Sequence, residues 1–120
     1  MPKIKLSIRP LQESLERIHP GSGAVFNIAP LKGERDQELT RECSDLYGNV
    51  QPVLFARAVA KECCKGWKYV GDAAVEAPCN EQNIDEFARN HASTIMPWFI
   101  REARSIEHYR EQEIGEAKKD

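Results

Sequence analysis

One segment of this 120-residue chain constrains the fold more than any other, because residues 53–64 are apolar on nearly every side. Its apolar side chains are Val53, Leu54, Phe55, Ala56, Ala58, Val59, Ala60 and Cys63. Pro52 suits the first turn of a helix, and Lys65 with Gly66 is a typical helix end. A helix that is apolar all round must be covered by its neighbours. We therefore expect residues 53–64 to form the central helix of the core.

The amino-terminal third indicates two short strands. Residues 3–9 alternate polar and apolar side chains, which is the period of a half-buried strand, and residues 24–29 are typical of a second strand. Between them, Leu11, Leu15 and Ile18 have the spacing of a short amphipathic helix, and residues 19–23 form a loop rich in Gly and Pro. We expect the two strands to pair as a small β-ribbon.

Three further helices are expected. Residues 34–47 begin with Glu34 and Asp36 and carry a thin apolar stripe that ends with Leu46 and Tyr47. Asn80 is a suitable N-cap for the next helix, and Ser93 for the last one, whose first turn accommodates Pro97. Residues 67–79 indicate a short hairpin or an ordered loop.

These elements predict an α+β fold that is mainly α, with four to five packed helices, a small N-terminal β-ribbon and a short central hairpin. The length suits one domain, which we place at residues 1–112. Residues 113–120 are mostly charged and are expected to be a frayed tail.

Charge and hydropathy exclude several classes of protein. The formal net charge of -2 argues against binding nucleic acid through a basic face. The apolar runs are far shorter than the roughly 20 residues that a membrane-spanning helix needs. The amino terminus lacks the apolar stretch of a signal peptide. We therefore expect a cytoplasmic protein, in which the four cysteines (Cys43, Cys63, Cys64 and Cys79) stay reduced.

A search for catalytic or metal-binding patterns predicts none. Zinc ligands normally come as spaced pairs, and here only Cys63 and Cys64 are close in the sequence. Cys63 or Cys64 with His91 could be a nucleophile and its base only if the fold brought them together. Glu81 with Asp85 and Glu107 with Glu111 have helical spacing but polar surroundings, as on a solvated face. We expect no metal, no cofactor and no enzyme.

Aromatic residues near helix boundaries are the candidates for protein binding. Trp and Tyr are favoured at the centres of protein interfaces. Trp67, Val70, Trp98 and Ile100 are the contact residues that we select. The alternative is that Trp67 folds over the helix ends and Trp98 packs beneath it, within the core.

The order of segments resembles that of a known family. A strand followed by Pro30 and an acidic helix, a buried helix that leads into the sequence KGWKYVGD (residues 65–72), and Pro78 before a capped helix with Ile84 and Phe87 make up this order. It resembles the small tail-assembly chaperones and related tail proteins of long-tailed phages and prophages, over about residues 24–105. Ala73 and Ala74 depart from the family, which often has a glycine-containing turn there.

The resemblance implies a non-catalytic chaperone that binds the tape measure protein and helps to recruit tail tube subunits, without a cofactor. Apolar helix surface would cover apolar helix surface of the client. Two alternatives stay open: a structural virion component such as a head-tail or tail connector, and a DNA-binding regulator in which residues 34–64 form a helix-turn-helix. A homo-oligomer is compatible with each of them.

Overall fold

The central helix is α2, and the other elements are arranged around it. The computed structural model describes residues 11–72 and 74–110. Helix α2 (Pro52–Cys63) contacts α1 (Gly33–Glu42), α3 (Glu81–Asn90) and α4 (Ile95–Arg104), and it runs directly into strand β3 (Cys64–Lys68). Phe55, Ala56, Val59, Ala60 and Cys63 are buried, as the apolar pattern predicts. Val53 and Leu54 are 44% and 40% exposed, so the first turn of α2 is not covered.

The sheet has three antiparallel strands in the order β1, β2, β3. Strand β1 (Leu15–Ile18) and strand β2 (Val25–Ile28) form a hairpin whose loop has positive φ angles at Gly21 and Gly23. Phe26 and Ile28 of the middle strand are fully buried. Strand β2 confirms the strand predicted at residues 24–29, but its neighbours on both sides are β1 and β3, so the ribbon predicted between residues 3–9 and 24–29 is not the observed pairing. The strand predicted at residues 3–9 lies outside the described residues.

The helix expected at residues 11–18 is wrong, because residues 15–18 form strand β1. Leu11, Leu15 and Ile18 do have helical spacing, but a helix of eight residues is marginal by itself. Pairing with β2 joins Leu15 to Ile28 and Ile18 to Val25, which satisfies backbone groups along the strand. Pairing with β2 therefore outweighs the helical spacing and makes residues 15–18 a strand at the edge of the sheet.

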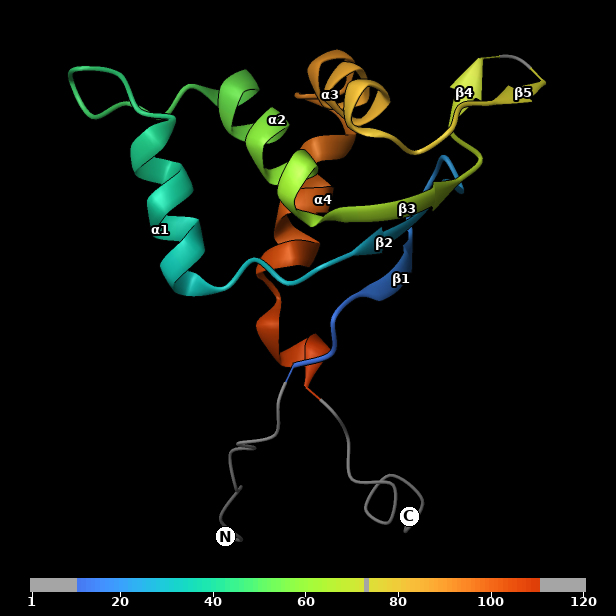
Figure 1. Cartoon of the computed structure of the whole chain (residues 1–120), viewed down its shortest axis with the longest axis horizontal. Helices are drawn as coiled ribbons and strands as arrows, with labels where there is room; N and C mark the ends of the chain where they lie inside the picture. The colour runs from blue at the N-terminus through green and yellow to red at the C-terminus, as the bar shows by residue number, and fades with distance from the viewer. Residues whose placement is uncertain (1–10, 73, 111–120) are drawn as a thin grey trace, which may run out of the picture.

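Phe26 is the centre of the core. Its ring contacts Trp67 of β3, Phe87 of α3, and Trp98 and Phe99 of α4, with ring centroids 5.4 to 6.5 Å apart. Helices α3 and α4 thus cover the face of β2 from which Phe26 projects. Figure 1 shows α2, α3 and α4 gathered beside the sheet, with α4 behind α2.

Two helix ends differ from the sequence expectation. Helix α1 stops at Glu42 instead of continuing to residue 47. Gly66 does not cap α2, because the chain enters β3 at Cys64. Gly66 lies opposite Asn27 in the sheet, where an added Cβ would be 3.1 Å from the Asn27 amide nitrogen. A larger residue at position 66 would therefore require a small shift of the Asn27 side chain.

The last two helices begin near the expected places. The side chain of Asn80 accepts a hydrogen bond from the backbone N–H of Asn83 at 2.8 Å, which confirms this N-cap. Helix α4 begins at Ile95, after Thr94, so the Ser93 cap is wrong, although Pro97 does lie in the first turn. A short 3-10 helix, η1 (Ile106–Tyr109), follows α4.

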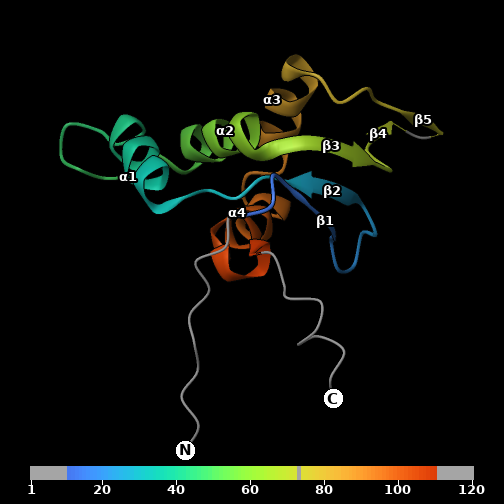
Figure 2. The same ribbon diagram turned by 60° about the horizontal axis from the view of Figure 1, so that its bottom comes forward.

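The fold is α+β and mainly α, with four α-helices in the described part of the chain. The expected central hairpin consists of β4 (Gly71–Asp72) and β5 (Val75–Glu76). Figures 1 and 2 show that this hairpin projects from one end of the molecule, while α1 and the loop after it lie at the other end. The two projections therefore offer two separate surfaces.

Candidate functional site: an apolar loop and a charged groove

The two tryptophans selected from the sequence lie in the core. Trp67 is 9% exposed and Trp98 is 8% exposed. The indole N–H of Trp67 donates a hydrogen bond to the Ala77 carbonyl at 2.8 Å, and Trp98 packs against Phe26 and the His19 ring. The alternative interpretation, in which both indoles are structural, fits these contacts. Neither side chain presents much surface to a partner.

Val70 and Ile100, the other two selected residues, are half-buried against the core. Val70 joins Trp67 in lining a hollow of about 450 Å³ between the end of β3 and helix α3. Trp98 and Ile100 are not in this lining, so the four residues do not form one surface. The exposed apolar surface has to be sought elsewhere.

Most of that surface is concentrated after helix α1. Eight large hydrophobic residues are exposed in the described part of the chain, and five of them fall between positions 46 and 54. We call these five residues the loop surface: Leu46, Tyr47, Val50, Val53 and Leu54. Leu46 is 100% exposed and Tyr47 is 88% exposed. Single exposed hydrophobic residues are common, whereas five of them within nine consecutive positions indicate a candidate binding site.

The loop that carries Leu46 and Tyr47 has a defined conformation. The Asp45 carboxylate accepts hydrogen bonds from the backbone N–H groups of Tyr47 and Asn49, both at 2.9 Å. The Asp45 N–H donates to the Asn49 carbonyl, and Gly48 has the positive φ of 81° that this reversal requires. A β-bridge between Ser44 and Val50 closes the base of the loop. Helix α1 therefore ends early because Asp45 organises a turn.

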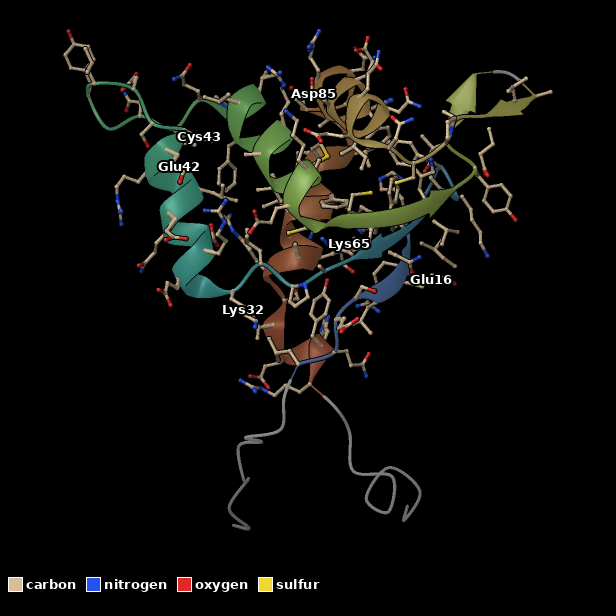
Figure 3. All side chains as sticks on the ribbon, viewed as in Figure 1. Glu16, Lys32, Glu42, Cys43, Lys65 and Asp85 are labelled. Atoms are coloured by element: carbon tan, nitrogen blue, oxygen red, sulfur yellow. The ribbon has the colours of Figure 1, made fainter. Side chains whose placement is uncertain are left out.

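A groove between α1 and α2 continues from the loop surface. It has a volume of about 350 Å³, and Leu54 belongs both to this groove and to the loop surface. Leu39, Leu54 and Ala58 supply its apolar lining. Arg35 and Glu42 lie along α1, while Arg57 and Lys61 lie along α2. Figure 3 labels Glu42 on α1 and Asp85 on α3, which lie on opposite sides of α2.

Asp85 is the strongest electrostatic feature near this groove. Its carboxylate accepts two hydrogen bonds from the Arg57 guanidinium, at 2.7 and 3.1 Å, and also pairs with Lys61 and Arg89. The hydrogen bonds from Arg57, followed by the charge of Lys61, lower the pKa of Asp85 to about 2. Asp85 is thus ionised at neutral pH and links α2 to α3.

The thiols are poorly suited to nucleophilic chemistry. Burial raises the pKa of Cys63 and of Cys64 to about 12, so both stay protonated at neutral pH. Cys64 Sγ lies 3.9 Å from Cys79 Sγ, and burial also raises the pKa of Cys79. His91 contacts the Phe87 ring and the Thr94 hydroxyl. These contacts give His91 a structural setting at the end of α3.

The other two histidines and Glu107 also have side-chain partners, while Glu111 lies outside the described residues. His19 Nδ1 is 2.7 Å from the Ser22 hydroxyl, and His108 Nδ1 is 3.0 Å from an Arg17 nitrogen. Glu107 pairs with Arg110. Among residues 11–72 and 74–110, no group of three or more His, Cys, Asp or Glu side chains is placed to hold a metal ion.

The helix-turn-helix alternative does not match the geometry of α1 and α2. Residues 43–51 connect these helices, whereas the turn of that motif has three or four residues. Arg57 and Lys61, the basic side chains of α2, are engaged by Asp85. Both side chains thus hold α2 against α3 through Asp85 and stay partly exposed along the groove between α1 and α2.

Comparisons of the chain with protein-family models, with curated proteins and with solved structures find no match. In the described residues no helix has the length and apolar character needed to cross a membrane.

Proposed function

We propose that this chain is a non-catalytic tail assembly chaperone of a long-tailed phage or prophage, which binds the tape measure protein and helps to recruit tail tube subunits in the host cytoplasm. The observation that carries the proposal is the loop surface. It has five exposed apolar side chains at one end of the molecule, three on the loop that Asp45 holds in shape and two on the first turn of α2. The order of segments that resembles tail-assembly chaperones supplies the kind of client.

The loop surface suits this role for an energetic reason. Burying a Leu side chain contributes about 1.5–3 kcal/mol relative to leaving it in water. Leu46 and Tyr47 obtain almost none of this stabilisation within the chain, because both remain exposed. A client with exposed apolar helices supplies the missing cover, and its own apolar surface is protected from aggregation in return.

Co-expression with the tape measure protein encoded in the same genome tests the proposal. We expect the tape measure protein to become soluble and to co-purify with the wild-type chain. The double variant Leu46→Ser/Tyr47→Ser should lose most of the co-purification. Ile18→Ser/Val75→Ser is the matched control, since these residues are 64% and 72% exposed but lie outside the loop surface. If the wild-type chain repeatedly fails to recover the tape measure protein, the proposal is wrong.

A second candidate is a structural connector of the virion, which one observation favours. Tyr69 and Val75, which are 75% and 72% exposed, form a further apolar projection at the end opposite to the loop surface. Tyr69 has a φ of 63°, which is uncommon for a residue other than glycine and holds its side chain at the rim of the 450 Å³ hollow. Mass spectrometry of purified particles decides between the two roles, because a chaperone should be absent and a connector present.

A further inference from the structure

The groove between α1 and α2 has walls of opposite charge. Along the edge nearer α1, the Arg35 guanidinium lies between three carboxylates, at 2.7 Å from Glu62 of α2 and at 3.3 Å and 3.7 Å from Glu38 and Glu42 of α1. One cation among three anions leaves this cluster with a formal charge of -2, from +1 and -3. The side chains of Glu38 and Glu42 are 47% and 63% exposed, so this excess charge reaches the surface.

The other wall has the opposite excess. Asp85 lies between three cations, at 2.7 Å from Arg57, 3.0 Å from Lys61 and 3.3 Å from Arg89. This cluster has a formal charge of +2, from +3 and -1. The Asp85 side chain is only 16% exposed, while those of the three cations are 32%, 39% and 52% exposed. The positive charge is therefore the part that a partner meets.

Apolar side chains lie between these two clusters. Leu54 and Ala58 are four residues apart and lie on one face of α2. Leu39 of α1 lines the same groove, and the loop surface begins at its end. Leu39 is buried, so the apolar surface that is open to solvent between the carboxylates and the cations comes from Leu54 and the half-buried Ala58.

We propose that this groove docks one amphipathic helix of a partner protein, with an apolar ridge that covers Leu54 and Ala58, Lys or Arg on the flank facing α1, and Asp or Glu on the flank facing α2 and α3. The inference rests on the proposed function, and it specifies which kind of client segment is bound. Charge complementarity commits it to this occupant, because a helix flank of opposite charge is attracted by each wall and a flank of the same charge is repelled. Nucleic acid does not fit, since its phosphates would meet Glu38 and Glu42.

The length of α2 sets the size of the docked helix. Twelve residues at about 1.5 Å per residue span roughly 18 Å, or about three turns. The ridge of the partner helix therefore has three or four apolar residues at intervals of three and four. A helix with opposite charges on its two flanks fits in one chain direction only, because reversing it would place each flank against the wall of the same charge.

A library of displayed helices tests the inference without knowledge of the client. Each member has about 20 residues, a fixed apolar ridge, and flank positions that vary among Lys, Glu and Gln. Selection on the wild-type chain should enrich helices with Lys on one flank and Glu on the other by at least about tenfold over helices with mixed flanks. A change of tenfold corresponds to about 1.4 kcal/mol.

Two matched charge variants test the contribution of each wall to the flank preference. Arg57→Gln/Lys61→Gln should abolish the preference for Glu and keep the preference for Lys. Glu38→Gln/Glu42→Gln should do the reverse. The second pair lies on exposed positions, so it gives a result even if the first pair weakens the fold, which circular dichroism would reveal. Equal enrichment of all flanks, or the same charge on both flanks, would overturn the inference, as would preferences that neither variant changes.

Self-association and client binding are measured separately. If sedimentation shows a dimer of this chain that both charge variants dissociate, the occupant is a second copy and the inference is wrong. If the tape measure protein co-purifies equally with the wild type and with both charge variants, the proposed function stands and the inference that the groove binds the client is wrong. If the library shows the opposite-flank preference but the tape measure protein does not bind, the groove stands and the proposed client is wrong.

Discussion

Replacing Asp45 with Ala should release the loop surface without unfolding the protein. The Asp45 carboxylate accepts two backbone hydrogen bonds at 2.9 Å, from Tyr47 and Asn49, and no buried side chain depends on it. Each such bond contributes about 1 kcal/mol net. Losing both should favour local opening of the loop by about 2 kcal/mol, which is roughly a 30-fold change in the opening equilibrium.

Amide hydrogen exchange measures this opening at Tyr47 and Asn49 directly. In Asp45→Ala we expect both amides to exchange 10- to 30-fold faster than in the wild type, by the same two-bond reasoning. Asp45→Asn is the control, because its amide oxygen can still accept, and it should exchange at close to the wild-type rate. Amides at core positions such as Val59 should not change.

The result that would refute this reasoning is rapid exchange of both amides in the wild type, at the rate found in Asp45→Ala. The loop would then have no defined conformation, and its apolar residues would not form a prepared binding surface. A large fall in the global stability of Asp45→Ala would also contradict it, since the loop would then be part of the core.

Three further substitutions test stability, and one labelling experiment tests the reactivity of the cysteines. Phe26→Ala should lower the free energy of unfolding by about 3–5 kcal/mol in urea titrations, because a fully buried ring that contacts four others is lost. Tyr109→Phe should be neutral or stabilising by up to about 1 kcal/mol in the same assay, because the buried Tyr109 hydroxyl has no hydrogen-bond partner among the described residues. Asp85→Asn should cost about 1 kcal/mol at pH 7, a value reduced for solvent screening; since the pKa of Asp85 is lowered to about 2 in the fold, the difference from the wild type should vanish as the pH falls from about 4 to 2. In alkylation followed by mass spectrometry at pH 7, Cys79 should react before Cys63 and Cys64, because it is half-buried and they are buried with pKa values of about 12.

Elements with local signals could be predicted from the sequence. Pro52 and the apolar run after it place α2, and Asn80 places the start of α3, because caps and first turns involve residues that are neighbours in the chain. The buried strand β2 could also be found, since its apolar residues lie between a glycine-rich loop and Pro30. These signals do not need the rest of the fold.

Elements that depend on distant partners could not be predicted. Residues 15–18 have helical spacing, and only pairing with β2 makes them a strand. Gly66 is a plausible helix cap by itself, and only the approach of Asn27 explains it as part of a strand. In both cases a tertiary contact outweighs the local preference.

The candidate site was missed for a related reason. Tryptophan is common at protein interfaces, but Trp67 and Trp98 both pack against Phe26 in the core, and Trp67 also donates a hydrogen bond to the Ala77 carbonyl. Leu46 and Tyr47 fit the apolar stripe of a helix, and the turn at Asp45 exposes them instead. The available sequence signal was Asp45 followed by Gly48 and Asn49, which is typical of a turn.

Calorimetry of the purified chain with the tape measure protein tests whether the loop surface binds the client. We expect Leu46→Ser/Tyr47→Ser to weaken binding by at least about 30-fold, which is the loss of roughly 2 kcal/mol of apolar burial. Thermal stability should stay unchanged, and Ile18→Ser/Val75→Ser should bind like the wild type. Wild-type affinity in the loop variant, or equal losses in both variants, would contradict the claim that the loop surface binds the client.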